Sequence, residues 1–225
     1  MASPQQKQQH NKPAFVIGNG KSRLGVNLAA VKLHGVVYAC NAVYREFAPD
    51  HLIAVDSKMV KEIVRTGFHL TNQVWTNPNT TILNIEKLNY FNPHKGWSSG
   101  PTALSLAVDH GFTDIYILGF DFEGIDGNLN NVYADTENYR KSTDQATYWG
   151  NWINQTATVI KNNPTVTFYR VVRETDNINF EQLPQGSDNF KHVYHKDFLT
   201  KYSYWIKTTD WLKNQSSSSS FKYVQ

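Results

Sequence analysis

The chain has a single cysteine and no apolar run long enough to cross a membrane, and each absence excludes a class of protein. One cysteine among 225 residues cannot form an internal disulfide. Cys40 closes an apolar run, so we expect a buried, unreactive thiol. No apolar run approaches the roughly 20 residues that a membrane-spanning helix needs, and the polar segment 1–12 has no apolar signal region. The sequence therefore predicts a cytoplasmic protein, in the host cytoplasm if its source is viral.

Several motifs that mark metal or cofactor sites are also missing. The eight histidines are scattered, and none has a metal-binding spacing such as H-E-x-x-H. No D-x-D pair is present to hold a metal against a nucleotide sugar. The glycine corner at 18–22 is neither G-x-G-x-x-G nor a complete P-loop, because Phe15 stands where the earlier glycine is needed. We therefore expect no metal and no resident cofactor, and the pattern disfavours nicotinamide and ATPase chemistry.

The composition is that of a globular protein with a mildly basic balance. Hydrophobic residues make up 40% and charged residues 18% of a chain long enough to bury a substantial core. A net charge of +3 permits contact with nucleic acid or anionic glycans without requiring either. The basic and aromatic residues after Tyr169 could form a path for DNA or simply a solvated C-terminal face. They are Arg170, Arg173, Lys191, Lys196, Lys201, Tyr202, Tyr204, Trp205, Lys207, Trp211 and Lys213.

Apolar runs alternate with amphipathic stretches between residues 14 and 172, which predicts a parallel sheet with right-handed crossovers. The fold class that we expect is α/β, a Rossmann-like open and mostly parallel sheet with helices on both faces and a lid-like loop at 123–142. The strands are expected at 14–17, 36–40, 51–55, 115–118 and 166–172, with weaker candidates at 74–76 and 81–83. The helices are expected over Leu24, Leu28 and Val31, from Ser57 to Arg65 with Ser57 as the cap, from Ser98 or Ser99 to Val108, and over Trp149, Ile153, Ala157 and Ile160.

This pattern divides the chain into three parts. Residues 1–13 are expected to be a disordered tail, since they are polar and rich in glutamine. Residues 14–175 form the predicted Rossmann-like domain. Residues 176–225 are expected to be a partly irregular C-terminal extension.

Three corners between elements carry glycine and polar side chains. They are Gly18-Asn19-Gly20-Lys21-Ser22, Ser98-Ser99-Gly100 and Gly119-Phe120-Asp121-Phe122. Glycine lets the backbone approach a phosphate closely, and the N–H groups at a helix start favour anions. Because ligands of open parallel sheets bind at the carboxyl ends of the strands, these corners can form one site. Each of them can also be a plain structural turn.

Further side chains at strand ends and in the long loop suggest more specific roles. Asn41 can pair with a base or ribose, or cap a turn. Asp121 can hold a ribose or act as a base, or it can satisfy backbone donors in a tight turn. Phe122 can stack on a base or pack in the core. Tyr133 can donate a proton to a departing phosphate, or be an exposed loop tyrosine.

The order of these motifs resembles that of the bacterial sialyltransferase family that includes the lipooligosaccharide enzymes. The G-N-G-x-S corner, the C-N pair at 40–41, the S-S-G helix start, and L-G-F-D-F followed by an N-x-Y-A-D-T loop carry the resemblance, over roughly residues 15–172. The skeleton is also similar to 6-hydroxymethylpterin diphosphokinase-like domains. Lys21 replaces the family's proline, Glu123 replaces its tyrosine, and its general-base histidine has no counterpart before the late helix.

The resemblance implies a CMP-sugar donor and transfer without a metal, which would make residues 14–175 a nucleotide-sugar-binding domain. It places Asn19, Ser22 and Asn41 on the nucleotide, Ser99 and Gly100 on its phosphate or sugar, Gly119, Asp121 and Phe122 near the ribose and base, and Tyr133 on the leaving phosphate. With Gly18 and Gly20 in the corner, these are the expected binding residues. Asp121, Glu123 and Asp135 are then the candidates for the catalytic base.

The sequence thus predicts a glycosyltransferase that moves a sugar from a CMP- or UDP-sugar to an acceptor hydroxyl. The acceptor could be a glycan or, for a viral enzyme, a modified DNA base. Two alternatives stay open: a catalytically inactive nucleotide-binding protein, and a pterin-type diphosphokinase that needs ATP and magnesium. The sequence leaves the oligomeric state unknown.

Overall fold

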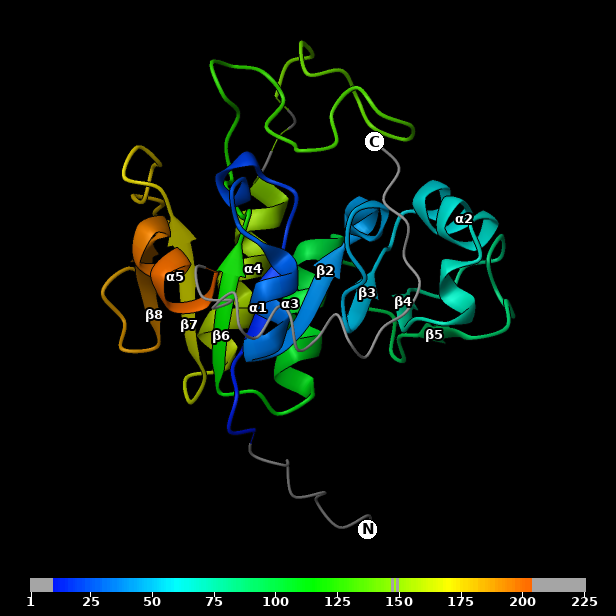
Figure 1. Cartoon of the computed structure of the whole chain (residues 1–225), viewed down its shortest axis with the longest axis horizontal. Coiled ribbons are helices and arrows are strands. Elements are labelled where there is room, and N and C mark those ends of the chain that lie inside the picture. The colour runs from blue at the N-terminus through cyan, green and yellow to red at the C-terminus, as the bar shows by residue number, and fades with distance from the viewer. Residues whose placement is uncertain (1–9, 147, 149, 204–225) are drawn as a thin grey trace, which may run out of the picture.

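An open, all-parallel sheet of eight strands forms the centre of the protein (Figure 1). The computed structural model describes residues 10–146, 148 and 150–203. The strand order is β5-β4-β3-β2-β1-β6-β7-β8, and every neighbouring pair is parallel. The strands are β1 (Ala14–Ile17), β2 (Val36–Cys40), β3 (His51–Ile53), β4 (Val74–Thr76), β5 (Leu88–Tyr90), β6 (Asp114–Leu118), β7 (Thr167–Val172) and β8 (Phe190–Tyr194). The expected α/β, Rossmann-like fold class is confirmed.

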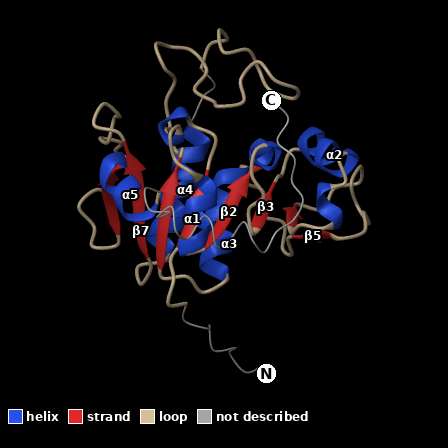
Figure 2. Ribbon diagram, viewed as in Figure 1, coloured by secondary structure: helices blue, strands red, loops and turns tan. Residues whose placement is uncertain are grey.

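Helices cover both faces of the sheet (Figure 2). They are α1 (Leu28–His34), α2 (Ser57–Arg65), α3 (Ser99–Asp109), α4 (Gly150–Asn162) and α5 (His195–Tyr202). Side chains alternate along each strand, so Val16 packs in the core under α3 and α4, whereas Phe15 and Ile17 pack in the core with α1, α2 and α5. Both faces of β1 are therefore apolar and buried, as is usual for a central parallel strand. No helix in the described part is both long and apolar enough to cross a membrane.

The strand order reverses direction between β1 and β6. From β1 the chain builds outward through β2 to β5, and then returns through α3 to place β6 on the other side of β1. Ile17 is in register with Leu118, and Gly18 N–H donates to the Leu118 carbonyl at 2.8 Å. Connections that leave neighbouring strands in opposite directions open a crevice at their carboxyl ends, where ligands of such folds bind.

The structure contains three elements that the sequence did not predict, and lacks one that it did. β5 lies in a segment expected to be loop, and β8 and α5 lie in the C-terminal segment expected to be partly irregular. Both strands are at edges of the sheet, and β8 alternates buried Phe190 with exposed Lys191, so neither shows a continuous apolar run. The predicted strand at 81–83 is instead a turn, in which Leu83 is half exposed.

One helix begins later than expected, and another has a different N-cap. α1 starts at Leu28, because the Asn27 side chain accepts from Ala30 N–H at 3.1 Å, and Leu24 follows a short 3-10 turn and is 46% exposed. Asp56, rather than Ser57, caps α2 by accepting from Lys58 N–H at 2.8 Å. Trp149, expected on the last helix of the α/β unit, lies outside the described residues.

A cluster of histidines and aromatic rings near the amino-terminal ends of the strands predicts sensitivity to acid. Trp75 Nε1 donates to His51 Nδ1 at 3.2 Å, and the ring of Tyr38 stacks on His51. Burial, with nearby His110 adding to the effect, lowers the pKa of His51 to about 4. The unfolded chain therefore takes up the proton first, and stability falls as the pH drops from about 6.5 towards 4.

Replacing His51 with glutamine, which can still accept from Trp75, should flatten that part of the pH dependence. The measurement is the urea midpoint of both proteins at pH values between 4 and 7. The wild type should lose more stability than His51→Gln over this interval. Parallel curves for the two proteins would show that His51 is not the group responsible.

Candidate functional site

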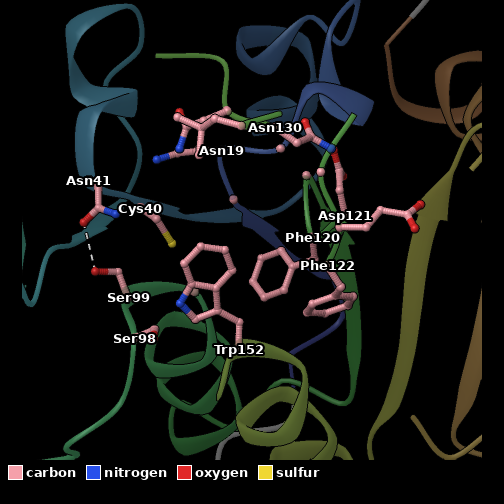
Figure 3. A pocket seen from close by; sticks show the side chains of 18 of the residues that line it. Asn19, Cys40, Asn41, Ser98, Ser99, Phe120, Asp121, Phe122, Asn130 and Trp152 are labelled. Carbon is pink, nitrogen blue, oxygen red and sulfur yellow. Dashed lines mark hydrogen bonds between the residues drawn. The ribbon is translucent and has the colours of Figure 1, made fainter. Parts of the chain in front are cut away.

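A cavity opens at the carboxyl ends of β1 and β6, where the strand order reverses (Figure 3). Its volume is about 180 Å³. It is lined by the three glycine-containing corners, by the end of β2, by the start of α4 and by the long loop after β6. Ten residues singled out from the sequence lie on its wall: Gly18, Asn19, Gly20, Asn41, Ser99, Gly100, Gly119, Asp121, Phe122 and Glu123. Asn19, Ser99 and Asp121, which are remote in sequence, thus face a common space.

The first and third corners are in direct backbone contact. Gly20 N–H donates to the Gly119 carbonyl at 2.9 Å. A Cβ on Gly18 would lie 2.5 Å from the Gly119 carbonyl oxygen, and Gly119 itself has a φ of +67°. Any side chain at either position would push the two strand ends apart, so glycine is required here by the close approach of the backbones.

Asp121 uses its carboxylate to hold the first corner. Its two oxygens accept from Ser22 Oγ and from Ser22 N–H, the second at 3.1 Å. The carboxylate lies so close over Gly20 that a Cβ there would be 2.4 Å from its carbon. Of the three roles expected for Asp121, satisfying donors in a tight turn is the one that these contacts match. Ser22, occupied by Asp121, is not among the described residues that line the cavity.

The second corner joins the ends of β2 and β3 through one hydroxyl. Ser99 Oγ donates to Asn41 Oδ1 at 2.9 Å and accepts from Val55 N–H at 3.1 Å. Asn41 has a φ of +54°, a left-handed conformation that asparagine tolerates better than most residues. Because the hydroxyl of Ser99 is already paired, the groups that α3 offers to a ligand are the backbone N–H groups of its first turn.

A buried arginine supports the aromatic floor of the cavity. Arg170, on β7, is 3% exposed, and it donates to the carbonyls of Phe120 at 2.9 Å and Asp121 at 3.3 Å. Its guanidinium also lies 5.3 Å from the centre of the Phe122 ring, and Phe122 has a φ of +60°. Burial lowers the pKa of Arg170, although Asp121 and other nearby carboxylates act in the opposite direction. This side chain therefore fixes a strained corner from behind.

The long loop after β6 is fastened over the first corner. Val132 N–H donates to the Asn19 carbonyl at 2.8 Å, and Lys21 N–H donates to Asn130 Oδ1 at 2.9 Å. Asn19 Nδ2 donates to Tyr139 OH at 3.1 Å. These contacts bring Asn130 to the cavity wall and hold the Asn19 side chain in place.

Tyr133 and Asp135, two of the predicted catalytic residues, are not among the described residues that line the cavity. Tyr133 OH donates to Glu46 and accepts from Arg23 Nη2 at 2.8 Å, and burial raises the pKa of this tyrosine. Asp135 is exposed and accepts from Ser142 N–H at 3.0 Å; its hydrogen bonds to Ser142 lower the pKa of the carboxyl. Both side chains thus have partners within the loop and its surroundings.

Glu123 is the carboxylate on the cavity wall with the fewest partners. It follows directly on the third corner, and Asn177 Nδ2 donates to its Oε2 at 3.4 Å. Asp121, the other carboxylate among the described lining residues, already accepts two hydrogen bonds. Glu123 therefore has the acceptor capacity that a proton-accepting group requires.

Sequence reasoning assigned neither Trp152 nor Cys40 to the site, although both lie on the cavity wall. Trp152 lies one position from Ile153, off the apolar stripe by which α4 was recognised, and it is 40% exposed. An aromatic residue on the polar side of an amphipathic helix was the signal that could have identified it. Cys40 also reaches the wall (Figure 3), and burial raises the pKa of its thiol to about 12, as expected of an unreactive cysteine.

Several basic residues that suggested a path for DNA have internal partners instead. Arg170 is buried, and Arg173 donates to the carbonyls of Ser22 at 3.2 Å and Leu24 at 2.9 Å. Lys201 lies 4.9 Å from the ring centre of Tyr202. Five members of that set lie outside the described residues: Tyr204, Trp205, Lys207, Trp211 and Lys213.

The described residues include no group of three histidine, cysteine, aspartate or glutamate side chains that could hold a metal ion. Comparisons with protein-family models, with curated proteins and with solved structures found no match to this chain.

Proposed function

We propose that the protein is a glycosyltransferase that moves a sugar from a nucleotide-activated donor to an acceptor hydroxyl. The observation that carries this proposal is the meeting of three glycine-containing corners, remote in sequence, around one cavity where the strand order reverses. The resemblance of these motifs to the lipooligosaccharide sialyltransferases supports the same activity.

The corners supply the groups that a nucleotide phosphate needs. The first-turn N–H groups of α3, beside Gly100, carry the positive end of the helix dipole and favour an anion. The glycines at 18 and 119 let the two strand ends approach each other closely, which brings the first and third corners to the same cavity.

The reaction needs a group that takes a proton from the acceptor, and Glu123 fits this role best. The acceptor oxygen attacks the anomeric carbon, the bond from that carbon to the phosphate oxygen breaks, and the nucleoside phosphate leaves with the bonding electrons. The acceptor proton passes to the Glu123 carboxylate. Asp121 is less suitable, since both of its oxygens accept from Ser22.

The size of the cavity bears on how a donor lies in it. Its volume of about 180 Å³ is below the roughly 300–1,000 Å³ that is typical of small-molecule sites. A CMP- or UDP-sugar would place one end in the cavity and extend the other towards the acceptor. A glycan or a modified DNA base remains the proposed acceptor class, with no metal taking part.

A second candidate function is nucleotide binding without transfer. It is favoured by the engagement of Asp121 with Ser22 and by the pairing of Tyr133 with Glu46 outside the described lining, since both were expected to be catalytic. This function requires the same nucleotide site and differs only in turnover.

Binding and turnover can be tested separately. A thermal-shift panel of nucleotides and nucleotide sugars should raise the melting temperature with cytidine or uridine compounds, because a ligand of the native state stabilises it. Asn19→Leu, which puts an apolar group on the wall, should abolish that shift while circular dichroism stays unchanged. The matched control is Asn154→Leu, an exposed position on α4 outside the described lining.

Product analysis with CMP- and UDP-sugars then decides between the functions. Release of nucleoside phosphate with sugar transferred to an acceptor supports the glycosyltransferase. Tight binding without turnover for every donor and acceptor supports the second candidate. Turnover that needs ATP and magnesium with a pterin alcohol would replace both with diphosphoryl transfer.

A further inference from the structure

The indole of Trp152 is an exposed aromatic surface inside the proposed site. Figure 3 shows it projecting from α4 towards the cavity, in view between the Ser98–Ser99 corner and the rings of Phe120 and Phe122. It is 40% exposed, although large apolar side chains on a helix next to a cavity usually pack inward. Within the described part of the chain it takes part in no stacked, tilted or edge-on ring pair. One face of this ring is therefore available to a ligand.

The position of the ring is fixed by the contact between α4 and α3. Gln155, one helical turn after Trp152, accepts from Ser98 N–H through its Oε1 at 3.0 Å. Ile153 is fully buried in the core under α3 and anchors the same turn of α4. Because α4 is packed against α3, the Trp152 ring on it is already held in place. It therefore loses little conformational entropy when a ligand stacks on it.

Apart from Trp152, the cavity wall offers few groups that could bind a ligand strongly. Ring stacking is therefore the main source of affinity for the part of the ligand that enters the cavity. Phe120 and Phe122 add apolar surface, and the described lining residues include no lysine, arginine or histidine. The two lining carboxylates, Asp121 and Glu123, disfavour an anionic group in this part of the cavity. An uncharged flat ring fits these surroundings, with amide groups such as Asn19 and Asn130 at its edge.

We propose that Trp152 is the stacking platform of the cavity, on which a flat, uncharged ring of the ligand lies. The proposal rests on the site described under the proposed function and adds a ligand-binding residue to it. The base of a nucleotide and the C–H face of a sugar ring share this chemistry. Stacking on an aromatic side chain is sequence-tolerant and adds to affinity wherever the ring is desolvated.

Isothermal titration calorimetry on the full chain tests the proposal with two sets of probes. Nucleoside monophosphates (CMP, UMP and AMP) form the base arm, and galactose, glucose and ribose 5-phosphate form the sugar arm. Trp152→Leu keeps apolar bulk without a ring, and Trp152→Phe keeps a ring. We expect Trp152→Leu to weaken binding in one arm by about 5- to 150-fold, the range for loss of one stacked ring, and Trp152→Phe to recover most of it.

A spectroscopic measurement and a control accompany the titration. The probes of the responding arm should quench tryptophan fluorescence in the wild type, and the quenching should be lost in Trp152→Phe, since the ligand lies on the indole. Tyr194→Ala, which removes an exposed ring on β8, should change neither affinity nor quenching.

The outcomes distinguish the stacking role of Trp152 from the proposed glycosyltransferase activity. Nucleotide binding that is equal in the wild type and Trp152→Leu overturns the stacking role and leaves the glycosyltransferase standing. Trp152-dependent binding of a ring ligand without any sugar transfer supports stacking and overturns the transferase. If no probe in either arm binds the wild type, both proposals fail.

Discussion

Replacing Glu123 with glutamine should lower kcat for sugar transfer by about 10²- to 10⁴-fold, with little change in donor affinity. A positioned general base contributes a factor of this size, and glutamine keeps the shape of the side chain but cannot take up the acceptor's proton. Its amide can still lie beside Asn177, so the fold of the corner should survive. The measurement is steady-state transfer kinetics together with calorimetric binding of the donor. A parallel loss of binding would show that Glu123 acts on the donor rather than on the acceptor proton.

Two further variants decide which carboxylate is the base. Asp135→Asn alters an exposed side chain outside the described lining, so transfer should be little changed. Asp121→Asn weakens the contacts with Ser22, and it should affect donor binding and stability as well as rate. Full activity in Glu123→Gln combined with a large loss in Asp135→Asn would reverse the assignment, and would mean that the loop rearranges to bring Asp135 to the substrate.

Replacing Arg170 with methionine should lower the free energy of unfolding by about 2–4 kcal/mol. The carbonyls of Phe120 and Asn177, at 2.9 and 3.1 Å from the guanidinium, would lose their buried donor, at a cost of roughly 1–3 kcal/mol each. Methionine fills much of the volume and removes the cost of burying a charge, which offsets part of the loss. The change is large against a total stability of about 5–15 kcal/mol. Guanidinium denaturation of both proteins measures it.

The same variant should weaken ligand binding, because Arg170 holds the corner that carries Phe122 and Glu123. Arg65→Met is the matched control, since Arg65 forms an exposed ion pair with Glu137 and surface pairs contribute little. Its denaturation midpoint should stay near that of the wild type. An Arg170→Met protein as stable as the wild type would mean that water or a shifted side chain replaces the lost donors.

The cavity wall carries few charged side chains, and its shape depends on residues behind it, such as Arg170, that hold the backbone in place. Asn41 and Phe122 both have left-handed backbones at the cavity. Ser99 supports the first of them by donating to its side chain, and Arg170 supports the second by binding the carbonyls of the two preceding residues, Phe120 and Asp121. Residues with strained backbones of this kind persist only where several surrounding contacts hold them in that conformation. The polar side chains nearest the cavity therefore position the wall, and fewer remain for contact with a ligand.

The sequence predicted a strand or a corner correctly wherever one short segment was enough to specify it. A run such as 14–17 is apolar at every position and ends in glycine, which is enough to place a buried parallel strand and its corner. Edge strands lack this signal: β8 exposes Lys191 and has one face open, so its periodicity resembles that of a loop or a surface segment. The cap of α2 differs from expectation because adjacent polar residues, here Asp56 and Ser57, can cap a helix equally well.

The sequence by itself determined that the chain folds into an α/β sheet with glycine corners at the ends of its strands, because hydrophobic periodicity and glycine act over a few residues. Only the tertiary structure decided what each corner side chain does. Ser22 engages Asp121, and Tyr133 engages Glu46, over separations of about a hundred residues that no local pattern encodes. The same packing turned Trp152 into the cavity and Arg170 beneath its floor. A side chain's role follows from the partners that packing brings to it, and those partners are settled when the whole sheet assembles.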